Sequence, residues 1–181
     1  LMGRSAADFR PWARYQVPYA FRFPASPGLA SRREHRSVSP AVIKAAFRKL
    51  AHDFDVVVVE GVGGLLVPYG EGWEQTRLVK ELGLPVLLVA GNRLGAINQA
   101  LLSLEALASR RLRTLGLVFN SIDSRLHPAI ARDNHKMVES FSGKKVLGVL
   151  PWTRERGLMV RRFSPVGEAV MAGLGLGRRI R

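Results

Sequence analysis

Polar and glycine residues that could hold a phosphorylated ligand follow a run of four valines. Glu60 ends the run 55–60, which reads D-V-V-V-V-E, and the glycine-rich segment 61–64 (G-V-G-G) follows it directly. A carboxylate at the end of an apolar strand is costly without a partner, and Mg²⁺ beside phosphate oxygens is a natural one. Glycines let a backbone approach a phosphate closely. The alternative is a strand that ends in an exposed glutamate and an ordinary glycine turn.

Three further segments could contribute to the same kind of site. Segment 92–98 (N-R-L-G-A-I-N) would open a helix, where free backbone N–H groups can bind an anion or a carboxylate. The amide of Asn120 offers both a donor and an acceptor to a base edge. Trp152, which follows Pro151, could pack against a base. The alternatives are an ordinary strand–helix connection, a capping or turn asparagine and a core tryptophan.

Apolar runs that alternate with helical patterns would position these residues. The sequence predicts strands at 55–60, 85–90, 114–120 and 145–150, and helices at 40–52, 73–82, 96–111, 128–140 and, more briefly, 166–174. Strands that alternate with helices predict an α/β fold with a parallel sheet. In such a sheet ligands bind at the carboxyl ends of the strands, which is where the four segments above lie.

Local signals mark several ends of these elements. Ser39 followed by Pro40 suits an N-cap and a first helical turn. Gly83 suits a helix end. We expect residues 1–36 to be irregular, because their prolines break any long helix.

Composition narrows the class of protein. The chain has 181 residues, a net charge of +14 and no cysteine. The lack of cysteine excludes disulfide scaffolds, cysteine-ligated zinc sites and cysteine nucleophiles. The sequence shows no secretory signal and no apolar run near the roughly 20 residues of a membrane span, so we expect a cytoplasmic protein without a membrane partner. Its basic residues are dispersed pairs without a nucleic-acid-binding motif, so we expect no nucleic-acid partner.

Five segments, taken in order, resemble the dethiobiotin synthetase family. They are V-P-Y-A-F-R-F-P-A-S-P (17–27), V-V-V-V-E-G-V-G-G-L-L-V-P (56–68), L-P-V-L-L-V-A-G-N-R-L-G-A-I-N-Q-A-L-L (84–102), G-L-V-F-N-S (116–121) and L-G-V-L-P-W (147–152). Any one of them is a weak signal, whereas the ordered set is specific. The resemblance covers about residues 15–153.

The resemblance implies a P-loop-type α/β fold of three layers, with a parallel sheet and helices on both faces. It also implies an ATP-dependent ligase of biotin biosynthesis that forms carbon–nitrogen bonds. Such an enzyme makes the ureido ring of dethiobiotin from 7,8-diaminononanoate, CO₂ and ATP, with Mg²⁺ as the metal ion. A homodimer is implied as well.

Roles for individual residues follow from the resemblance at matching positions. Glu60 would be a Mg²⁺ ligand, and Gly61, Val62 and Gly63 would border the γ-phosphate and the carbamate. Asn120 would read adenine beside Ser121, and Pro151, Trp152 and Thr153 would line the base pocket. The carboxylate tail of the substrate would bind, across a dimer interface, to the backbone N–H groups of Leu94, Gly95, Ala96, Ile97 and Asn98.

Part of the family's pattern has no counterpart within residues 1–181. The family begins with a strand and a phosphate-binding loop, G-T-D-T-x-x-G-K-T, and adds a second lysine, a hydroxyl residue and a Mg²⁺-binding aspartate, none of which is found here. Arg77 stands at a usually acidic position. We therefore expect an N-terminally truncated domain at 1–153, without its first strand and P-loop, and a weakly matching tail at 154–181. We expect this polypeptide alone to be inactive and prone to aggregate.

Two other interpretations stay open. The chain could be a non-catalytic relative of the same fold that binds a nucleotide or a partner. Titration with an adenine nucleotide would then show weak, Mg²⁺-independent binding or none. A nucleic-acid-associated ATPase relative is suggested only by the net charge. Steeply salt-dependent binding to DNA would be its sign.

Overall fold

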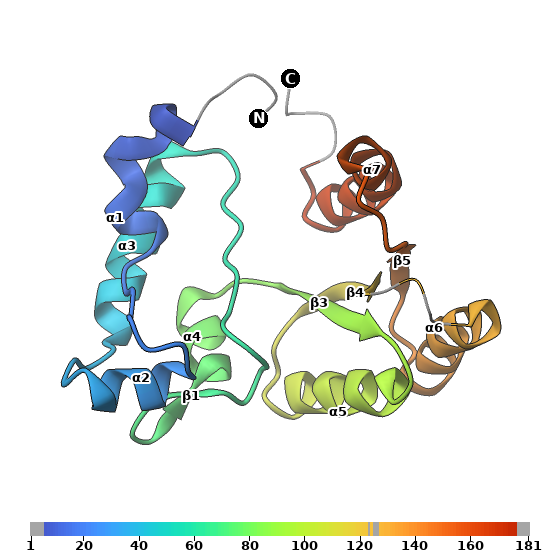
Figure 1. The fold of residues 1–181 in the computed structure, drawn as a ribbon, viewed down its shortest axis with the longest axis horizontal. Coiled ribbons are helices and arrows are strands. Elements are labelled where there is room, and N and C mark those ends of the chain that lie inside the picture. The colour runs from blue at the N-terminus through green and yellow to red at the C-terminus, as the bar shows by residue number, and fades with distance from the viewer. Residues whose placement is uncertain (1–5, 123, 125–126, 177–181) are drawn as a thin grey trace. The chain divides into compact units, whose positions relative to one another are not determined.

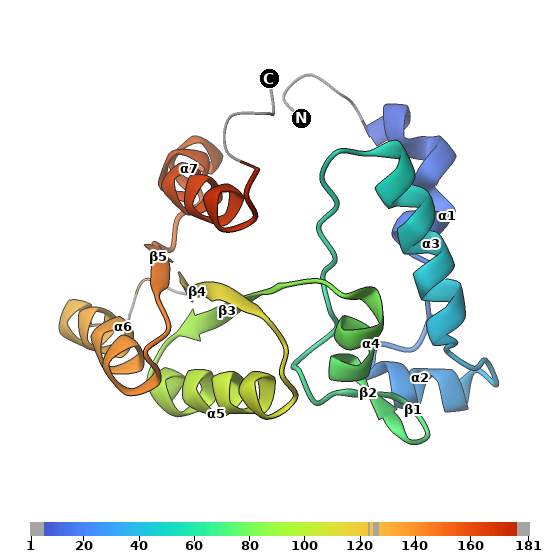
Figure 2. The same ribbon diagram turned by 180° about the vertical axis from the view of Figure 1, so that it is seen from behind.

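The computed structural model describes residues 6–122, 124 and 127–176, and the chain divides into two compact units, Leu1–Gly83 and Leu84–Arg181 (Figures 1 and 2). The first unit contains the 3₁₀ helix η1 (Ala6–Trp12), α1 (Ala13–Gln16), α2 (Pro27–Arg33), α3 (Pro40–Asp53), β1 (Pro68–Gly70), β2 (Trp73–Glu74) and α4 (Gln75–Leu82). The second contains β3 (Val86–Asn92), α5 (Ala96–Ser109), β4 (Thr114–Ser121), α6 (Pro128–Ser142), β5 (Val146–Leu150) and α7 (Arg156–Gly173).

A parallel sheet in the order β3–β4–β5 forms the centre of the second unit. The strands predicted at 85–90, 114–120 and 145–150 are confirmed, with small shifts at their ends. The helices predicted at 96–111 and 128–140 are confirmed as α5 and α6. Because the three strands run in the same direction, their carboxyl ends meet at one edge of the sheet.

Helices cover both faces of this sheet, as the fold class predicted (Figure 1). Along β4 the side chains alternate: Leu117 and Phe119 pack with α5 and α6, whereas Val118 packs with Val166 of α7. Each of these four side chains is at most 2% exposed. A strand buried on both faces needs a continuous apolar run, which the sequence L-V-F provides. The second unit is therefore a three-layer α/β structure.

Helix α7 is longer than the short helix predicted at 166–174. It begins at Arg156, and its buried contact with the sheet is made by Val166, which lies against Gly148 of β5. With so little of its surface buried, the helix leaves only a weak apolar pattern in the sequence. The division of the chain into 1–153 and 154–181 stays a prediction. Neither α7 nor any other helix in the described residues is long and apolar enough to span a lipid bilayer.

A separate apolar core holds the first unit together. Val38, Tyr69, Trp73 and Leu78 are buried there, and Tyr69 and Trp73 pack ring against ring with centroids 5.1 Å apart. The core joins the β1–β2 hairpin to α4. The helix predicted at 73–82 begins only at Gln75, because the two residues before it pair with β1 as β2.

The ends of the first unit's helices follow the sequence signals in part. The helix predicted at 40–52 is confirmed as α3, with Pro40 in its first turn. Ser39 lies at the cap position, but its hydroxyl caps nothing, and its backbone N–H donates to the Tyr19 hydroxyl at 3.0 Å. Gly83 ends α4 with φ 66°, as predicted, and its N–H bonds the last turn.

Short helices occupy much of the segment 1–36, for which irregular structure was predicted. They are η1, α1 and α2, and none exceeds seven residues. Pro27 stands in the first turn of α2, where its missing N–H costs no helical hydrogen bond. The prolines therefore limit helix length here without preventing helix formation.

Residues 55–60 do not form the strand that the valine run predicted. The segment crosses Figures 1 and 2 as an irregular connection after α3. Val58 is 88% exposed, and Val56 and Val59 are 41% and 42% exposed. β-branched residues favour an extended backbone, but a strand also needs a hydrogen-bonding neighbour. No strand in the described residues pairs with this segment, so the prediction is wrong for this structure.

Candidate functional site

The glycine-rich loop after Glu60 lies in the first unit, just before β1. A bond of 3.1 Å from the Val67 N–H to the Gly64 carbonyl closes it. Gly63 has φ 74°, and a Cβ there would lie 2.9 Å from the Val67 side chain, so the turn requires glycine. Exposed glycine backbone thus follows Glu60 directly in the chain, and Glu60 is exposed as well. This is the local arrangement that the phosphate hypothesis needs.

Tyr69 of β1 connects this loop to the core of the first unit. Its hydroxyl accepts a hydrogen bond from the Val62 N–H at 3.2 Å and donates one to Gln75 Oε1 at 3.1 Å. Burial raises the pKa of the Tyr69 phenol, which keeps the hydroxyl protonated and able to donate. The sequence analysis missed Tyr69 and Gln75, because V-P-Y-G marks only the start of a hairpin.

Glu60 could serve as one oxygen ligand of a Mg²⁺ ion. The described part of the chain contains no group of three or more His, Cys, Asp or Glu that could hold a metal ion by itself. In nucleotide sites Mg²⁺ takes one or two carboxylates and completes its shell with phosphate oxygens and water. A single exposed carboxylate next to a glycine loop fits such a shared shell.

In the second unit, the other predicted residues gather at the carboxyl edge of the sheet. The parallel ladder places Asn120 beside Leu150 and Ser121 beside Asn92. The segment 151–153 follows β5 at this edge. The carboxyl ends of the three strands are therefore neighbours, as the sheet topology predicted.

Trp152 has an accessible indole at this edge. Its side chain is 42% exposed, and the Arg154 guanidinium lies 5.7 Å from the ring centroid. The Thr153 hydroxyl accepts a hydrogen bond of 3.0 Å from the Glu155 N–H, which fixes the start of α7. A half-exposed aromatic ring on a fixed turn could take a flat ligand on its free face.

The start of α5 presents backbone amides. Gly95 precedes the helix with φ 85°, and the Ala96 N–H already donates to the Arg93 carbonyl at 3.1 Å. The N–H groups of Ile97 and Asn98 donate to no described residue. The first amides of a helix carry partial positive charge, so these two could bind an anion.

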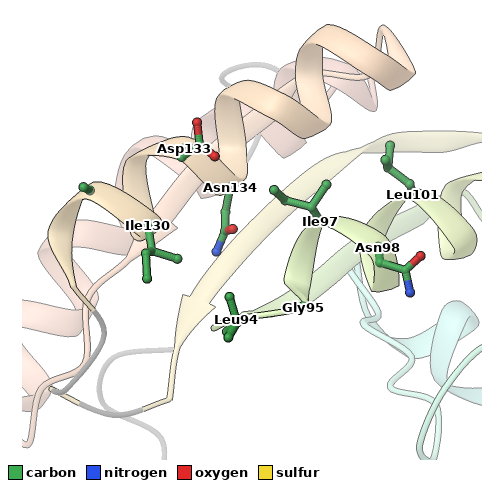
Figure 3. Close-up of a pocket in the computed structure, with 9 residues that line it drawn as sticks. Leu94, Gly95, Ile97, Asn98, Leu101, Ile130, Asp133 and Asn134 are labelled. Carbon is green, nitrogen blue, oxygen red and sulfur yellow. The ribbon is translucent and has the colours of Figure 1, made fainter.

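A groove of about 810 Å³ lies between the start of α5 and α6 (Figure 3). Four of the five residues predicted to hold the substrate tail line it, whereas Ala96 is 1% exposed and belongs to the core. The apolar part of the lining suits an aliphatic chain. Its residues are Leu94, Gly95, Ile97, Asn98, Leu101, Ala129, Ile130, Asp133 and Asn134.

A buried pair of asparagines fixes the segment before α5. Asn134 Nδ2 donates to Asn92 Oδ1 at 2.7 Å and to the Arg93 carbonyl at 3.2 Å. The two side chains are 3% and 1% exposed, respectively. Figure 3 shows Asn134 pointing from α6 into the space beside Leu94 and Ile97. The sequence analysis missed Asn134, since one polar residue within an amphipathic helix gives no distinct signal.

The predicted residues thus form two groups, each within one unit. Glu60, Gly61, Val62 and Gly63 belong to the first unit. The residues predicted to bind adenine and the substrate tail belong to the second.

Comparison of the sequence with known proteins identifies the family of this chain. A family model described as an AAA domain matches residues 6–157. An ATP-dependent dethiobiotin synthetase of Anaeromyxobacter dehalogenans is 37% identical over 86% of this chain and 68% of its own length. The chain belongs to the dethiobiotin synthetase family. The resemblance recognised in the sequence is therefore confirmed.

Other dethiobiotin synthetases match in the same way. The ATP-dependent dethiobiotin synthetase of Aromatoleum aromaticum is 42% identical over 82% of this chain and 65% of its own length. That of Akkermansia muciniphila is 44% identical over 74% of this chain and 62% of its own length. The chain thus spans somewhat less than two thirds of the length of these two dethiobiotin synthetases.

Proposed function

We propose that the protein is an ATP-dependent dethiobiotin synthetase that acts in biotin biosynthesis. Its substrates would be 7,8-diaminononanoate, CO₂ and ATP. The observation that carries this proposal is the groove at the start of α5, where an aliphatic lining meets two helix amides without partners in the described residues. Membership of the dethiobiotin synthetase family supports it.

The groove would hold the nonanoate chain and its carboxylate. Leu94, Ile97 and Leu101 would contact the methylene groups, and Gly95 would leave the backbone accessible. The carboxylate would accept hydrogen bonds from the amides of Ile97 and Asn98. Ala96 would shape the turn from the core side, because its own amide is already bonded.

ATP would bind at the carboxyl edge of the sheet. Asn120 would exchange a donor and an acceptor with adenine, and Ser121 lies beside it. The base would pack against the free face of Trp152, between Pro151 and Thr153. All these residues lie at the ends of β4 and β5, where ligands of α/β sheets bind.

The glycine loop would meet the γ-phosphate. Glu60 would ligate Mg²⁺, which neutralises charge on the phosphate oxygens when bound. The backbone of Gly61, Val62 and Gly63 would border the phosphate and the carbamate. Gly64 has open space around it, whereas the side chains of Gln75 and Val67 pack against Gly61 and Gly63, so Gly64 offers the most accessible backbone for such a role.

The chemistry would be phosphoryl transfer followed by ring closure. One substrate amine adds to CO₂ and forms a carbamate, whose oxygen attacks the γ-phosphorus of ATP and releases ADP. The second amine then attacks the carbonyl carbon of the carbamic–phosphoric anhydride, closes the ureido ring and releases phosphate. Transfer of this kind depends mostly on positioning and charge neutralisation, to which the loop amides and a Mg²⁺ ion held by Glu60 would contribute.

A homodimer forms part of the proposal. Leu94 is 84% exposed and Leu102 is 57% exposed, so the α5 region offers apolar surface to a second copy. A second copy could then supply the phosphate half of each site while this groove supplies the tail half.

Incorporation of labelled CO₂ tests the function. The full-length protein is incubated with ¹⁴CO₂, 7,8-diaminononanoate, ATP and Mg²⁺, and acid-stable label in dethiobiotin is counted. We expect label only when diamine, ATP and Mg²⁺ are all present. Binding of an adenine nucleotide without incorporation would instead support a non-catalytic relative. That residues 1–181 alone lack this activity stays a prediction, and the same assay on that polypeptide checks it.

A further inference from the structure

Tyr69 and Gln75 contact the glycine loop 61–64 but have no role in the function proposed above. We propose that the Tyr69 hydroxyl, together with Gln75, is a positioning device that fixes the loop 61–64 by binding the Val62 amide. The remaining loop amides are thereby left for phosphate. This inference rests on the proposed function, because it concerns the same phosphate loop.

Tyr69 is itself held firmly. Its side chain is 6% exposed and packs against Trp73, which is 8% exposed, in the core of the first unit. A buried ring with a fixed backbone on β1 has little freedom, so the core determines where the hydroxyl lies. The bond of 3.2 Å between the Val62 N–H and this hydroxyl therefore fixes the position of the loop as well.

Gln75 contacts the loop from a second direction. Its side-chain oxygen accepts the Tyr69 hydroxyl proton, and its backbone N–H donates to the Val67 carbonyl at 3.1 Å. A Cβ added to Gly61 would overlap the Gln75 side-chain amide. The loop is therefore in contact with Gln75 at its first glycine and bonded to it at its closing residue.

The hydrogen bonds divide the loop amides into two classes. The Val62 N–H is directed to the protein core through Tyr69. The N–H groups of Gly61, Gly63 and Gly64 donate to no described residue, and all three glycines are exposed. Val62 therefore serves to orient the loop, while its glycine neighbours keep free donors that an anion can use.

The direct test replaces Tyr69 with phenylalanine in the full-length protein. Tyr69→Phe keeps the ring in the core and removes only the hydroxyl. Tyr19→Phe is the matched control, because the Tyr19 hydroxyl also accepts a backbone N–H, that of Ser39 at 3.0 Å, beside the same core. Each variant loses one bond from a backbone amide to a tyrosine hydroxyl. Tyr69→Phe also loses the bond to Gln75 Oε1, so its thermal stability should fall somewhat further than that of Tyr19→Phe.

Hydrogen exchange and kinetics then separate positioning from stability. In Tyr69→Phe we expect the Val62 amide to exchange about 10-fold faster, the fold-change that one lost hydrogen bond brings. We expect kcat for dethiobiotin formation to fall by a similar factor while the KM for the diamine stays constant. Tyr19→Phe should change neither the exchange rate of Val62 nor kcat.

Two results would overturn the inference. One is an unchanged Val62 exchange rate in Tyr69→Phe, and the other is a kcat equal to that of Tyr19→Phe. If the parent protein makes no dethiobiotin, the proposed function fails separately. The exchange rate of Val62 and the affinity for a non-hydrolysable ATP analogue with Mg²⁺ then decide the inference, with weaker analogue binding expected only in Tyr69→Phe.

Discussion

The glycine loop 61–64 and the segment 92–98 both present backbone amides that donate to no described residue, yet they are supported differently. The loop follows a valine run that pairs with no described strand, and a tyrosine hydroxyl from a short hairpin holds it. The segment follows β3 and leads into α5, and the buried Asn92–Asn134 pair holds it.

The contrast indicates what each support can do. A loop held by a few contacts with the hairpin and Gln75 can shift without unfolding the hairpin, so changes there should alter the rate of chemistry. A segment built between a strand and two helices cannot shift without disturbing the sheet unit. Changes there should alter stability and the binding of the substrate tail.

The largest effect is expected from Glu60→Ala. If Glu60 ligates Mg²⁺, its loss should lower kcat by about 100-fold, because metal-ion stabilisation of the transition state contributes several kcal/mol. The KM for 7,8-diaminononanoate should change little, since the groove proposed for the substrate tail belongs to the other unit. Steady-state kinetics of labelled CO₂ incorporation measure both constants.

Glu105→Ala is the control for this variant. Glu105 is an exposed carboxylate on α5 that lines neither loop, so its removal should leave kcat unchanged. Equal turnover by the two variants would remove Glu60 from the metal site and end the proposed division between a rate loop and a binding loop.

The next effect in size is expected from Asn134→Ala. The change leaves the buried Asn92 Oδ1 without its donor, which should lower the free energy of unfolding by about 2 kcal/mol. The Arg93 carbonyl loses one of its two donors and keeps the Ala96 N–H. Urea denaturation measures this loss. We also expect a higher KM for the diamine, because the segment before α5 loses its attachment to α6.

A double variant sharpens this test. Asn92→Val with Asn134→Leu replaces both partners by apolar side chains, so no buried polar atom of the pair is left unbonded. Stability should return close to that of the parent. A single variant as stable as the parent would show that the pair does not support the segment.

Much of the second unit could be predicted from the sequence, because its partners lie within the same stretch. The apolar runs of β3, β4 and β5 are separated by helices of ordinary length, so each strand finds a neighbour nearby in the chain. This topology also predicted that Asn120, Ser121 and Trp152 lie at one edge of the sheet. The same rule predicted that segment 92–98 lies at this edge, whereas the groove that it forms with α6 was not predicted.

The features that could not be predicted depend on contacts between residues far apart in the chain. Such contacts leave no mark in the hydrophobic periodicity of the sequence. The run 55–60 has the composition of a strand, but pairing depends on a neighbour elsewhere in the chain. Tyr69 and Asn134 look like ordinary hairpin and helix residues until the fold brings Val62 and Asn92 to them. The extent of α7 was hidden because its buried contact rests on Val166.

The smallest effect is expected at Asp53, the last residue of α3, which makes another polar attachment in the first unit. Asp53 accepts hydrogen bonds from Lys49 at 2.6 Å and from the Trp12 indole at 2.6 Å, and His52 lies 2.8 Å away. The bond from Lys49, followed by those of His52 and Trp12, holds the pKa of Asp53 well below its ordinary value of 3.8. The folded unit therefore binds this proton less readily than the unfolded chain does.

The sign of the pH dependence follows from that lowered pKa. The stabilising contribution of Asp53 is fully present above pH 3.8 and is lost as the pH falls below it, since the unfolded chain takes up the proton first. We expect the contact of Trp12 with α3 to loosen in acid, seen as a change in tryptophan fluorescence. Asp53→Asn should lack this acid step while retaining the others. An identical acid profile in that variant would mean that the first unit does not depend on this side-chain attachment.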